Sequence, residues 1–581
     1  MNDRQTLWRK LRYVAAIVVL IIPLSMLSMP SSGSGTRNER SGGKLAQLRK
    51  EYKLSQTNLG EIDPASETMK LATLGMRGVA ANVLWHRADT YKKKEDWTNL
   101  SATLEQITKI QPNFISVWQF QAWNLSYNVS VEFDDYNDRY YWVIRGINFL
   151  KDGIEYNEDD PVLLNDIGWF VGQKIGRADE HVQFRKLFKA DDDYHNAEDP
   201  HRTQKQRDNW LVSRLWYQRA EDVVDSGRKS LRKKNPLLFY SSSSMALMNY
   251  ADALIDDGVL GDEVKLAWQD ADRAWTDYGD RPIMTSYGFH IHLNDLERKN
   301  QEAAEKRLRL EALAPEVTQA IHARLLAELD PPLREAWETP VDQRNEEQQH
   351  LATAAERTMK IPLAPLAKAI REASPQQGSE ADRLARLASV AAEEARATQH
   401  YRDTVNFSYW KSRAEMEQTD DALLARKHIQ EGNLALREAS LIQALKLYEQ
   451  GLDSWRKVVD RFPTLIDEGT TGDDLIEIIE KYAQIRSEAA IEEGDEKFPP
   501  EFPLRDIVER YDSEGKLRAL LTLPGAAENP AEDAESPATD KPEPTPTDSP
   551  DSTPNETATP EAASETGDYE GRPPEPVDNA A

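Results

Sequence analysis

The sequence predicts an all-α protein made of successive antiparallel helix pairs, and three observations lead to this prediction. Apolar residues recur at steps of three and four, as in Trp118, Ala122, Leu125 and Val129, which is the period of an amphipathic helix. Strictly alternating stretches, which would predict strands, are scarce. Proline and glycine interrupt the chain at intervals typical of single helices. These breaks are Pro112, Pro161, Pro236, Gly258, Gly261, Gly279, Pro315 and Pro340.

The composition limits the possible functions. Of the 581 residues, 39% are hydrophobic and 30% are charged, which suits helices that bury one face each. The net charge of −28 argues against a nucleic-acid-binding protein, because such proteins need a basic surface. The absence of cysteine excludes disulfides, thiolate nucleophiles and Cys-ligated metals. We therefore expect no nucleic acid partner and no cofactor.

The N-terminus predicts a membrane anchor. Residues 1–12 form a basic segment with Arg4, Arg9, Lys10 and Arg12, and residues 13–29 form an apolar run close to the minimum length of a span. The alternative is a cleaved signal peptide, for which residues 31–33 form only a weak cleavage site. Long domains cross a membrane regardless of flanking charge. We therefore expect a single-pass protein of the inner (cytoplasmic) membrane with its body outside the cytoplasm, joined by a flexible linker at 30–66.

A first helical region is predicted at residues 67–300. Within 81–114, Ala88 is the small residue that lets two helices cross closely, and larger residues fill the space beside it. The larger residues are Leu84, Tyr91, Leu104 and Ile107, and Pro112 stops the second helix. This 34-residue pattern resembles the tetratricopeptide repeat (TPR), in which two antiparallel helices form each repeat of a solenoid. Leu100 departs from the small residue expected at its position. A helix pair without a clear motif is predicted at 237–255 and 264–278.

A second match to the TPR pattern starts at Ala425, within a second helical region predicted at 401–524. Gly432, Ala444, Tyr448 and Gly451 stand at the expected positions, whereas His428 and Ala435 replace large residues. Between the two regions, residues 301–400 are rich in Ala, Glu and Arg and predict long helices. Residues 525–581 form an acidic Pro/Thr/Ser-rich tail, predicted to be disordered because it lacks large apolar residues.

The TPR resemblance implies a concave binding groove lined by positions 2, 5, 9 and 12 of each first helix. These positions are Asn82, Trp85, Asp89 and Lys92 in the first repeat, and Ser116, Gln119, Trp123 and Ser126 in the next. Trp85, Asp89, Lys92, Gln119 and Trp123 are the predicted partner-binding residues, since aromatic side chains often anchor a bound peptide. Most tryptophans before residue 217 should instead be core.

A second resemblance covers residues 74–216 and is based on residues 118–142 and 168–188. This stretch is similar to uncharacterised bacterial membrane-anchored proteins, some of which carry the label "iron responsive element". That label names an RNA structure and describes no protein chemistry. The resemblance implies a helical-repeat protein of the cell envelope.

Two groups of residues are weak candidates for a metal site. His290 and His292 could share one face of a strand, but the neighbouring residues favour a helix, on which the two side chains would diverge. Asp193 and His195 belong to an acidic segment without the glycine and late glutamate of a calcium loop, which predicts a solvated loop instead. The sequence contains no GxSxG nucleophile elbow, no phosphate-binding loop, no GxGxxG dinucleotide-binding turn and no HExxH zinc-protease helix. We therefore predict no catalytic residues.

The sequence thus favours a membrane-anchored scaffold that binds unidentified protein partners on a helical-repeat surface. The alternative is a structural spacer or self-associating envelope protein, built on the long helices of residues 301–400. A metal-dependent enzyme is the least favoured hypothesis. The residues do not indicate an oligomeric state.

Overall fold

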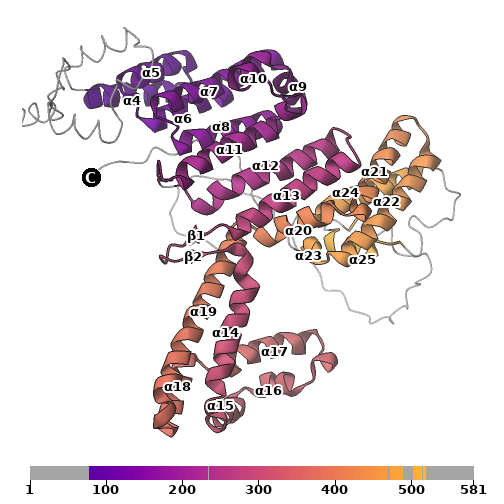
Figure 1. Cartoon of the computed structure of the whole chain (residues 1–581). Helices are drawn as coiled ribbons and strands as arrows, with labels where there is room; N and C mark the ends of the chain where they lie inside the picture. The colour runs from indigo at the N-terminus through magenta and orange to yellow at the C-terminus, as the bar shows by residue number, and fades with distance from the viewer. Residues whose placement is uncertain (1–76, 233, 468–470, 489–501, 513–514, 519–581) are drawn as a thin grey trace, which may run out of the picture. The chain divides into compact units, whose positions relative to one another are not determined.

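The computed structural model describes residues 77–232, 234–467, 471–488, 502–512 and 515–518. These residues are almost entirely helical, so the all-α class is confirmed (Figure 1). No described helix is long and apolar enough to cross a membrane. The predicted anchor at 13–29, the linker at 30–66 and the tail at 525–581 lie outside the described residues. Chain contacts divide the protein into two compact units, taken in turn below.

Unit 1 contains residues 77–187 and 222–230 of the described chain. Helices α4 to α8 follow one another as hairpins, in which each helix packs against the next. Their bounds are α4 (Arg77–Lys93), α5 (Trp97–Ile110), α6 (Ile115–Trp123), α7 (Tyr136–Tyr156) and α8 (Pro161–Trp169), followed by α9 (His181–Ala190), which runs into unit 2. Two of these helices continue as π-helices, α6 over Asn124–Val129 and α8 over Phe170–Lys174.

Local sequence signals explain where these helices begin and end. Asp96 caps α5 by accepting a hydrogen bond from the backbone N–H of Asn99 at 3.2 Å. Pro112 follows the end of α5, and its carbonyl oxygen accepts a 2.7 Å hydrogen bond from the indole of Trp118. The helix hairpin predicted within 81–114 is therefore present as α4 and α5. Its core includes Leu100, which is fully buried.

Unit 2 contains residues 188–221 and the described residues from 231 onward. Its first helices are α10 (Asp192–Glu198), α11 (Asn209–Asp225, ending in unit 1), α12 (Pro236–Asp256) and α13 (Asp262–Asp280). The helix pair predicted at 237–255 and 264–278 is present as α12 and α13. Trp268 and Trp275 of α13 are fully buried in the core that these helices share with α20. A short hairpin, β1 (Ile283–Met284) and β2 (His290–Ile291), follows α13, with Ile283 opposite Ile291.

The middle of the chain forms a helical arm. Helix α14 packs against α19, and α18 also packs against α19 (Figure 1). The bounds are α14 (Leu296–Glu311), α15 (Pro315–Glu328), α16 (Pro331–Glu338), α17 (Glu346–Met359), α18 (Leu363–Ala373) and α19 (Gly378–Thr404). The prolines at 315, 331 and 362 stand at helix starts, where a missing N–H is tolerated. Most of the buried residues of α19 are alanines.

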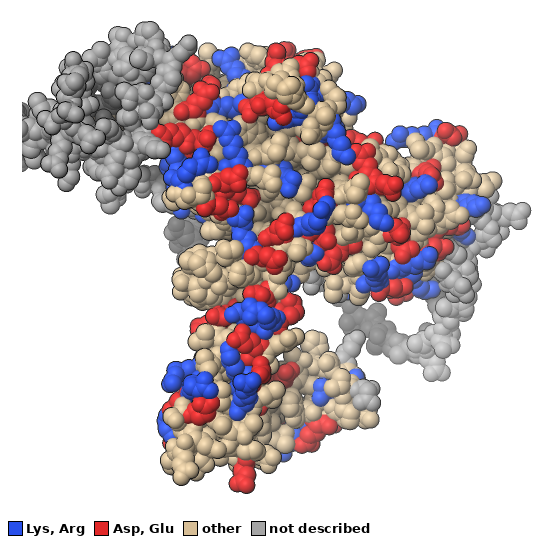
Figure 2. Space-filling model, in the orientation of Figure 1, with Lys and Arg blue, Asp and Glu red and all other residues tan. Residues whose placement is uncertain are grey.

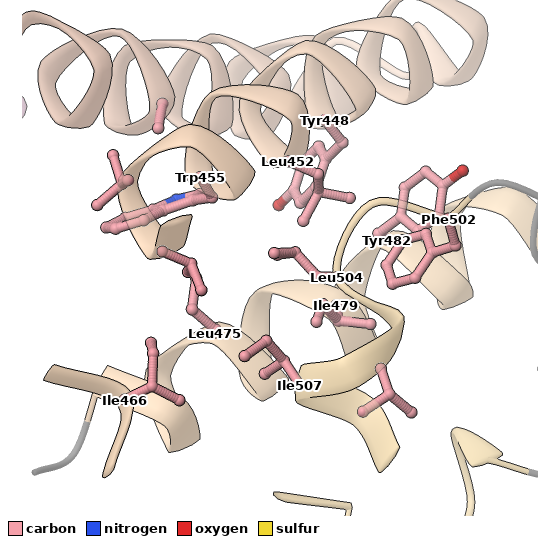
Figure 3. Close-up of a cluster of buried hydrophobic side chains, with 14 of the residues drawn as sticks. Tyr448, Leu452, Trp455, Ile466, Leu475, Ile479, Tyr482, Phe502, Leu504 and Ile507 are labelled. Carbon is pink, nitrogen blue, oxygen red and sulfur yellow. The ribbon is translucent and has the colours of Figure 1, made fainter. Parts of the chain in front are cut away.

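The C-terminal helices of unit 2 pack around one apolar cluster (Figure 3). They are α20 (Phe407–Glu417), α21 (Asp420–Arg437), α22 (Leu441–Arg461), α23 (Thr464–Asp467), α24 (Thr471–Glu488) and α25 (Arg505–Tyr511). Helices α21 and α22 cross closely because both carry glycine at the contact. A Cβ atom on Gly432 would lie 2.7 Å from the ring of Tyr448, and one on Gly451 would lie 2.7 Å from Ile429. Gly432 and Gly451 both belong to the TPR-like match that starts at Ala425, and their lack of a side chain allows this close crossing.

Candidate functional site

Half-buried aromatic side chains of unit 1 form one surface on α4, α6 and α8, the first helices of successive hairpins. We call this surface the aromatic face. It consists of Trp85, Phe120, Trp123, Tyr127 and Trp169, together with Lys92 and Lys174. Trp85, Lys92 and Trp123 were predicted as binding residues, and the structure places all three here.

The first part of the aromatic face links α4 to α6. The ring of Trp85 lies 5.7 Å from Phe114 and 5.8 Å from Phe120, the latter edge to face. Lys92, two turns further along α4, places Nζ 5.2 Å from the centre of the Phe120 ring. Such a cation–π contact holds the ammonium group at the surface while its aliphatic stem packs on the ring. Asp89 lies nearby in sequence but pairs with Lys93 at 2.8 Å, one turn away.

The second part links α6 to α8. Trp123 stacks on Tyr127 with ring centres 4.0 Å apart, and on Trp169 at 5.8 Å. Lys174, which is nine-tenths buried, places Nζ 4.4 Å from the centre of the Tyr127 ring. Burial lowers the pKa of Lys174 and raises that of Tyr127, because both charged forms lose water. Because Tyr127 and Trp169 are also only 6.0 Å apart, the three rings form a compact cluster, with a partly desolvated cation beside Tyr127.

A hydrogen bond fixes the two helices beside this cluster. Gln119 of α6 donates from Nε2 to Asp166 Oδ2 of α8 at 2.6 Å. Two predicted groove residues of α6 therefore contact α8, the first helix of the next hairpin. Gln119 contacts Asp166, and Trp123 contacts Trp169. Ser116 and Asn82, at the other inferred groove positions, are exposed.

The prediction for Ser126 was wrong. Its side chain is fully buried and donates a 3.3 Å hydrogen bond to the carbonyl oxygen of Val143 on α7. The cause is the π-helix at Asn124–Val129, whose wider turn changes which residues face outward. Tyr127, rather than Ser126, continues the line of Gln119 and Trp123. The sequence has no recognisable signal for a π-helix, so Tyr127 and Lys174 were missed.

The arrangement offers groups suited to recognition of another molecule. Partly exposed ring edges, two lysines and an amide–carboxylate pair provide apolar contact area and hydrogen-bonding groups in a small region. Figure 2 shows Lys and Arg interspersed with Asp and Glu over the visible side of the described residues. Among these residues, no three His, Cys, Asp or Glu side chains come together in a way that could hold a metal ion.

The backbone conformation at the candidate metal ligands His290 and His292 differs from the prediction. We expected a helix there, but His290 lies on β2 and His292 is extended, with φ −119° and ψ 129°. The β-hairpin overrides the helical pattern because Thr285 pairs with Phe289 around Gly288, which has a φ of +85°. His292 Nδ1 lies 3.4 Å from Asp295 Oδ2.

The segment around Asp193 and His195 also differs from the prediction. We expected a solvated loop, but residues 192–198 form α10, capped by Asp191, which accepts from the N–H of Tyr194 at 2.9 Å. Asp193 is exposed, whereas His195 is fully buried. His195 Nε2 lies 2.7 Å from the carbonyl oxygen of Phe188, and Nδ1 lies 3.2 Å from an Arg202 nitrogen. Both ring nitrogens are thus engaged within the fold.

We predict that His195 makes unit 2 sensitive to acid. Burial lowers the pKa of His195, although its bond to the Phe188 carbonyl opposes this shift. Below about pH 6.5 the unfolded chain therefore binds a proton that the folded chain excludes, and stability falls as the pH falls. We expect His195→Gln to flatten this dependence in urea unfolding measured from pH 7.5 to 5.5. The exposed His201→Gln serves as control, and identical profiles for His195→Gln and the unsubstituted protein would contradict the prediction.

A buried charge network lies in unit 2, and no sequence pattern pointed to it. It joins Asp252 of α12, Arg413 and Glu417 of α20, and Arg426 of α21. Glu417 is fully buried and accepts two hydrogen bonds from Arg426, one of them at 2.6 Å. Arg413 pairs with Asp252 at 2.8 Å and lies 4.0 Å from Glu417. Burial raises the pKa of Asp252, while Arg413 opposes that shift.

Comparison with known proteins gives this chain no family. A scan against models of protein families and a search of curated proteins both returned no match. Functional inference therefore depends on the residues and their geometry.

Proposed function

We propose that this protein is a membrane-anchored scaffold that binds a protein partner on the aromatic face. In this proposal, residues 13–29 anchor the chain in the inner membrane and the helical body lies outside the cytoplasm. The proposal includes a TPR-like solenoid, in which α4, α6 and α8 are successive first helices of the repeats.

One observation carries the proposal. The side chains at the inferred groove positions of α6 contact α8, through the Trp123–Trp169 stack and the Gln119–Asp166 hydrogen bond. Trp85 of α4 likewise contacts Phe120 of α6. Side-by-side first helices are what a repeat solenoid requires, and their shared surface is where such proteins bind partners. Half-buried tryptophan and tyrosine side chains bury a large area when a peptide or partner helix covers them.

We expect a photoreactive phenylalanine at position 123 to crosslink one partner reproducibly in cells. The aromatic probe replaces Trp123 with a side chain of similar size, so the fold of α6 should persist. The same probe at position 141 is a matched control, since Tyr141 is an exposed aromatic residue of α7, the second helix of its hairpin. Mass spectrometry of the crosslinked species identifies the partner.

The proposal predicts that Trp169→Ala reduces the crosslink from position 123 in a chain that is still folded by circular dichroism, although loss of the contacts with Trp123 and Tyr127 lowers its melting temperature. Equal crosslinking from positions 123 and 141 would refute a specific surface. Failure to capture any protein at position 123 in a folded, membrane-located chain would also refute it.

A further inference from the structure

Lys174 is a buried cation of the aromatic face without an anionic partner. Its side chain is only 9% exposed, and no carboxylate of the described residues lies within ion-pair distance of Nζ. Burial lowers the pKa of Lys174, as expected for an ammonium group that loses water without gaining a counter-ion. Buried lysines are almost always paired, so this position favours the approach of an anion.

The neighbouring charges of unit 1 leave the position open. Glu180 and Asp179 oppose the fall in the pKa of Lys174, and Arg139 adds to it. Glu180 already forms an ion pair with Arg139, so its charge is matched. Nζ of Lys174 has no hydrogen-bond partner among the described residues, yet it is not sealed from solvent. An incoming carboxylate can therefore reach it.

The rest of the aromatic face favours an aromatic side chain beside that carboxylate. Nζ of Lys174 lies 4.4 Å from the centre of the Tyr127 ring, and Tyr127 stacks on Trp123, so ring surface adjoins the cation. Lys92 lies half-buried over Phe120 and also has no carboxylate of the described chain within ion-pair distance. An aromatic ring flanked by two carboxylates would match these groups.

The acidic tail of this protein contains such a segment. Residues 526–581 include 15 acidic and two basic residues, and their only aromatic residue is Tyr569. Asp568 and Glu570 stand directly beside it in the sequence. The one large aromatic group of the tail is thus placed between two carboxylates, which is the chemistry that the aromatic face lacks.

The tail is long enough to reach the aromatic face. The last described residue is Leu517 or its neighbour at 518, and residue 568 lies 50 positions beyond position 518. A segment of that length spans up to about 165–180 Å when fully extended. Because it belongs to the same chain, its effective concentration at the face is on the order of millimolar, which favours it over a free segment of the same sequence.

We propose that residues 568–570 of the tail occupy the aromatic face, with a carboxylate on Lys174 and the ring of Tyr569 against the exposed ring edges. The tail then competes with the external partner, which binds only by displacing it. This inference rests on the proposed function, because it takes the aromatic face as a binding surface. It adds a competitor from within the chain.

The test places p-benzoylphenylalanine, a photoreactive residue, at position 569 of the full chain, purified in detergent without a partner. Mass spectrometry after irradiation identifies the attached peptides. We expect crosslinks within one chain to the peptides that contain Trp123 and Lys174. The same probe at position 538, between Pro537 and Thr539, is the control because neither neighbour is charged. Its yield on the aromatic face should be at least about fivefold lower.

Charge variants test the contact from both sides. Asp568→Asn combined with Glu570→Gln should lower the yield from position 569 by about fivefold or more, and leaves the sequence of the helical body unchanged. Asp548→Asn combined with Asp551→Asn removes the same charge elsewhere in the tail and should have little effect.

On the body, Lys174→Gln should reduce the yield from position 569, whereas Lys186→Gln, at an exposed position of α9, should not. Circular dichroism checks that both variants are folded. If Lys174→Gln unfolds the chain, the two double variants of the tail still decide the outcome, because they do not alter the body.

Several results would overturn the proposal. These are equal yields from positions 569 and 538, equal losses in the two double variants of the tail, or crosslinks only between two copies of the chain. Labelling of the face by the free peptide acetyl-Gly-Asp-benzoylphenylalanine-Glu-Gly-amide, but not by the tail, would favour an acidic segment of another protein instead. None of these results affects capture of a partner from position 123 in cells, so failure of the tail contact is distinguishable from failure of the proposed function.

Discussion

Replacing Glu417 with glutamine destabilises unit 2 by about 3–5 kcal/mol in our expectation, because it removes a fully buried carboxylate that lies within 4.0 Å of both arginines of the buried charge network. Arg426 then loses a charged acceptor that receives two of its N–H groups. The side chain of Arg426 is only 24% exposed, so losing its charged acceptor costs more than it would at a fully exposed position, where water replaces the partner. Urea unfolding followed by tryptophan fluorescence measures the loss.

Glu415 provides the matched control for Glu417, because it lies on the same helix. Its partner is Lys411, at 3.0 Å, and 47% of its side chain is exposed. Exposed ion pairs contribute at most about 1 kcal/mol, so Glu415→Gln should change the free energy of unfolding little. Similar losses for both variants would show that the buried network contributes no more than a surface pair.

Gly146→Ala should destabilise unit 1 by about 2–3 kcal/mol, even though alanine normally favours a helix over glycine. A Cβ atom at position 146 of α7 would lie 2.2 Å from Ser126 Oγ and 2.8 Å from the backbone oxygen of Ala122. Because the second of these is a backbone atom, α6 and its π-helix must shift to relieve the clash. We expect this shift to disturb the stack of Trp123 and Tyr127 as well.

The control is Gly78→Ala on α4, where no atom of the described residues lies within 4 Å of the added Cβ atom. That variant should be neutral or stabilising by up to about 1 kcal/mol. Thermal unfolding by circular dichroism compares the two. If Gly146→Ala proves as stable as Gly78→Ala, the close approach of α7 to the π-helix is not required for the fold.

The sequence predicted the elements whose signals are local. The period of apolar residues and the positions of proline predicted the hairpin within 81–114. The TPR pattern placed small residues at Gly432 and Ala444, where helices were expected to cross closely, and α21 does approach α22 closely at Gly432. The β-hairpin at 283–291 and helix α10 were missed. Both depend on tertiary context: Ile283 and Ile291 are buried against helices, and His195 is held by the carbonyl of Phe188.

The candidate site was predicted only in part, and the reason is again physical. Trp85, Lys92 and Trp123 follow from repeat positions, which assume a uniform 3.6-residue turn. The π-helix breaks that assumption after Trp123, so Ser126 was predicted in place of Tyr127. The buried charge network joins helices far apart in the chain, such as α12 and α21. No spacing rule within one sequence brings Asp252 and Arg413 together.

The helical arm has a consequence for how the protein is synthesised. Trp275 of α13 completes its packing with Phe407 of α20, at a ring-centre distance of 5.9 Å, yet the whole arm lies between them in the chain. At roughly 5–20 residues per second, translation of this interval takes roughly 6–25 seconds. Throughout that time the tryptophans of α13 lack the helix that covers them. The part of Trp275 that Phe407 covers is therefore exposed on the nascent chain for many seconds, and transiently exposed apolar surface of this kind promotes aggregation.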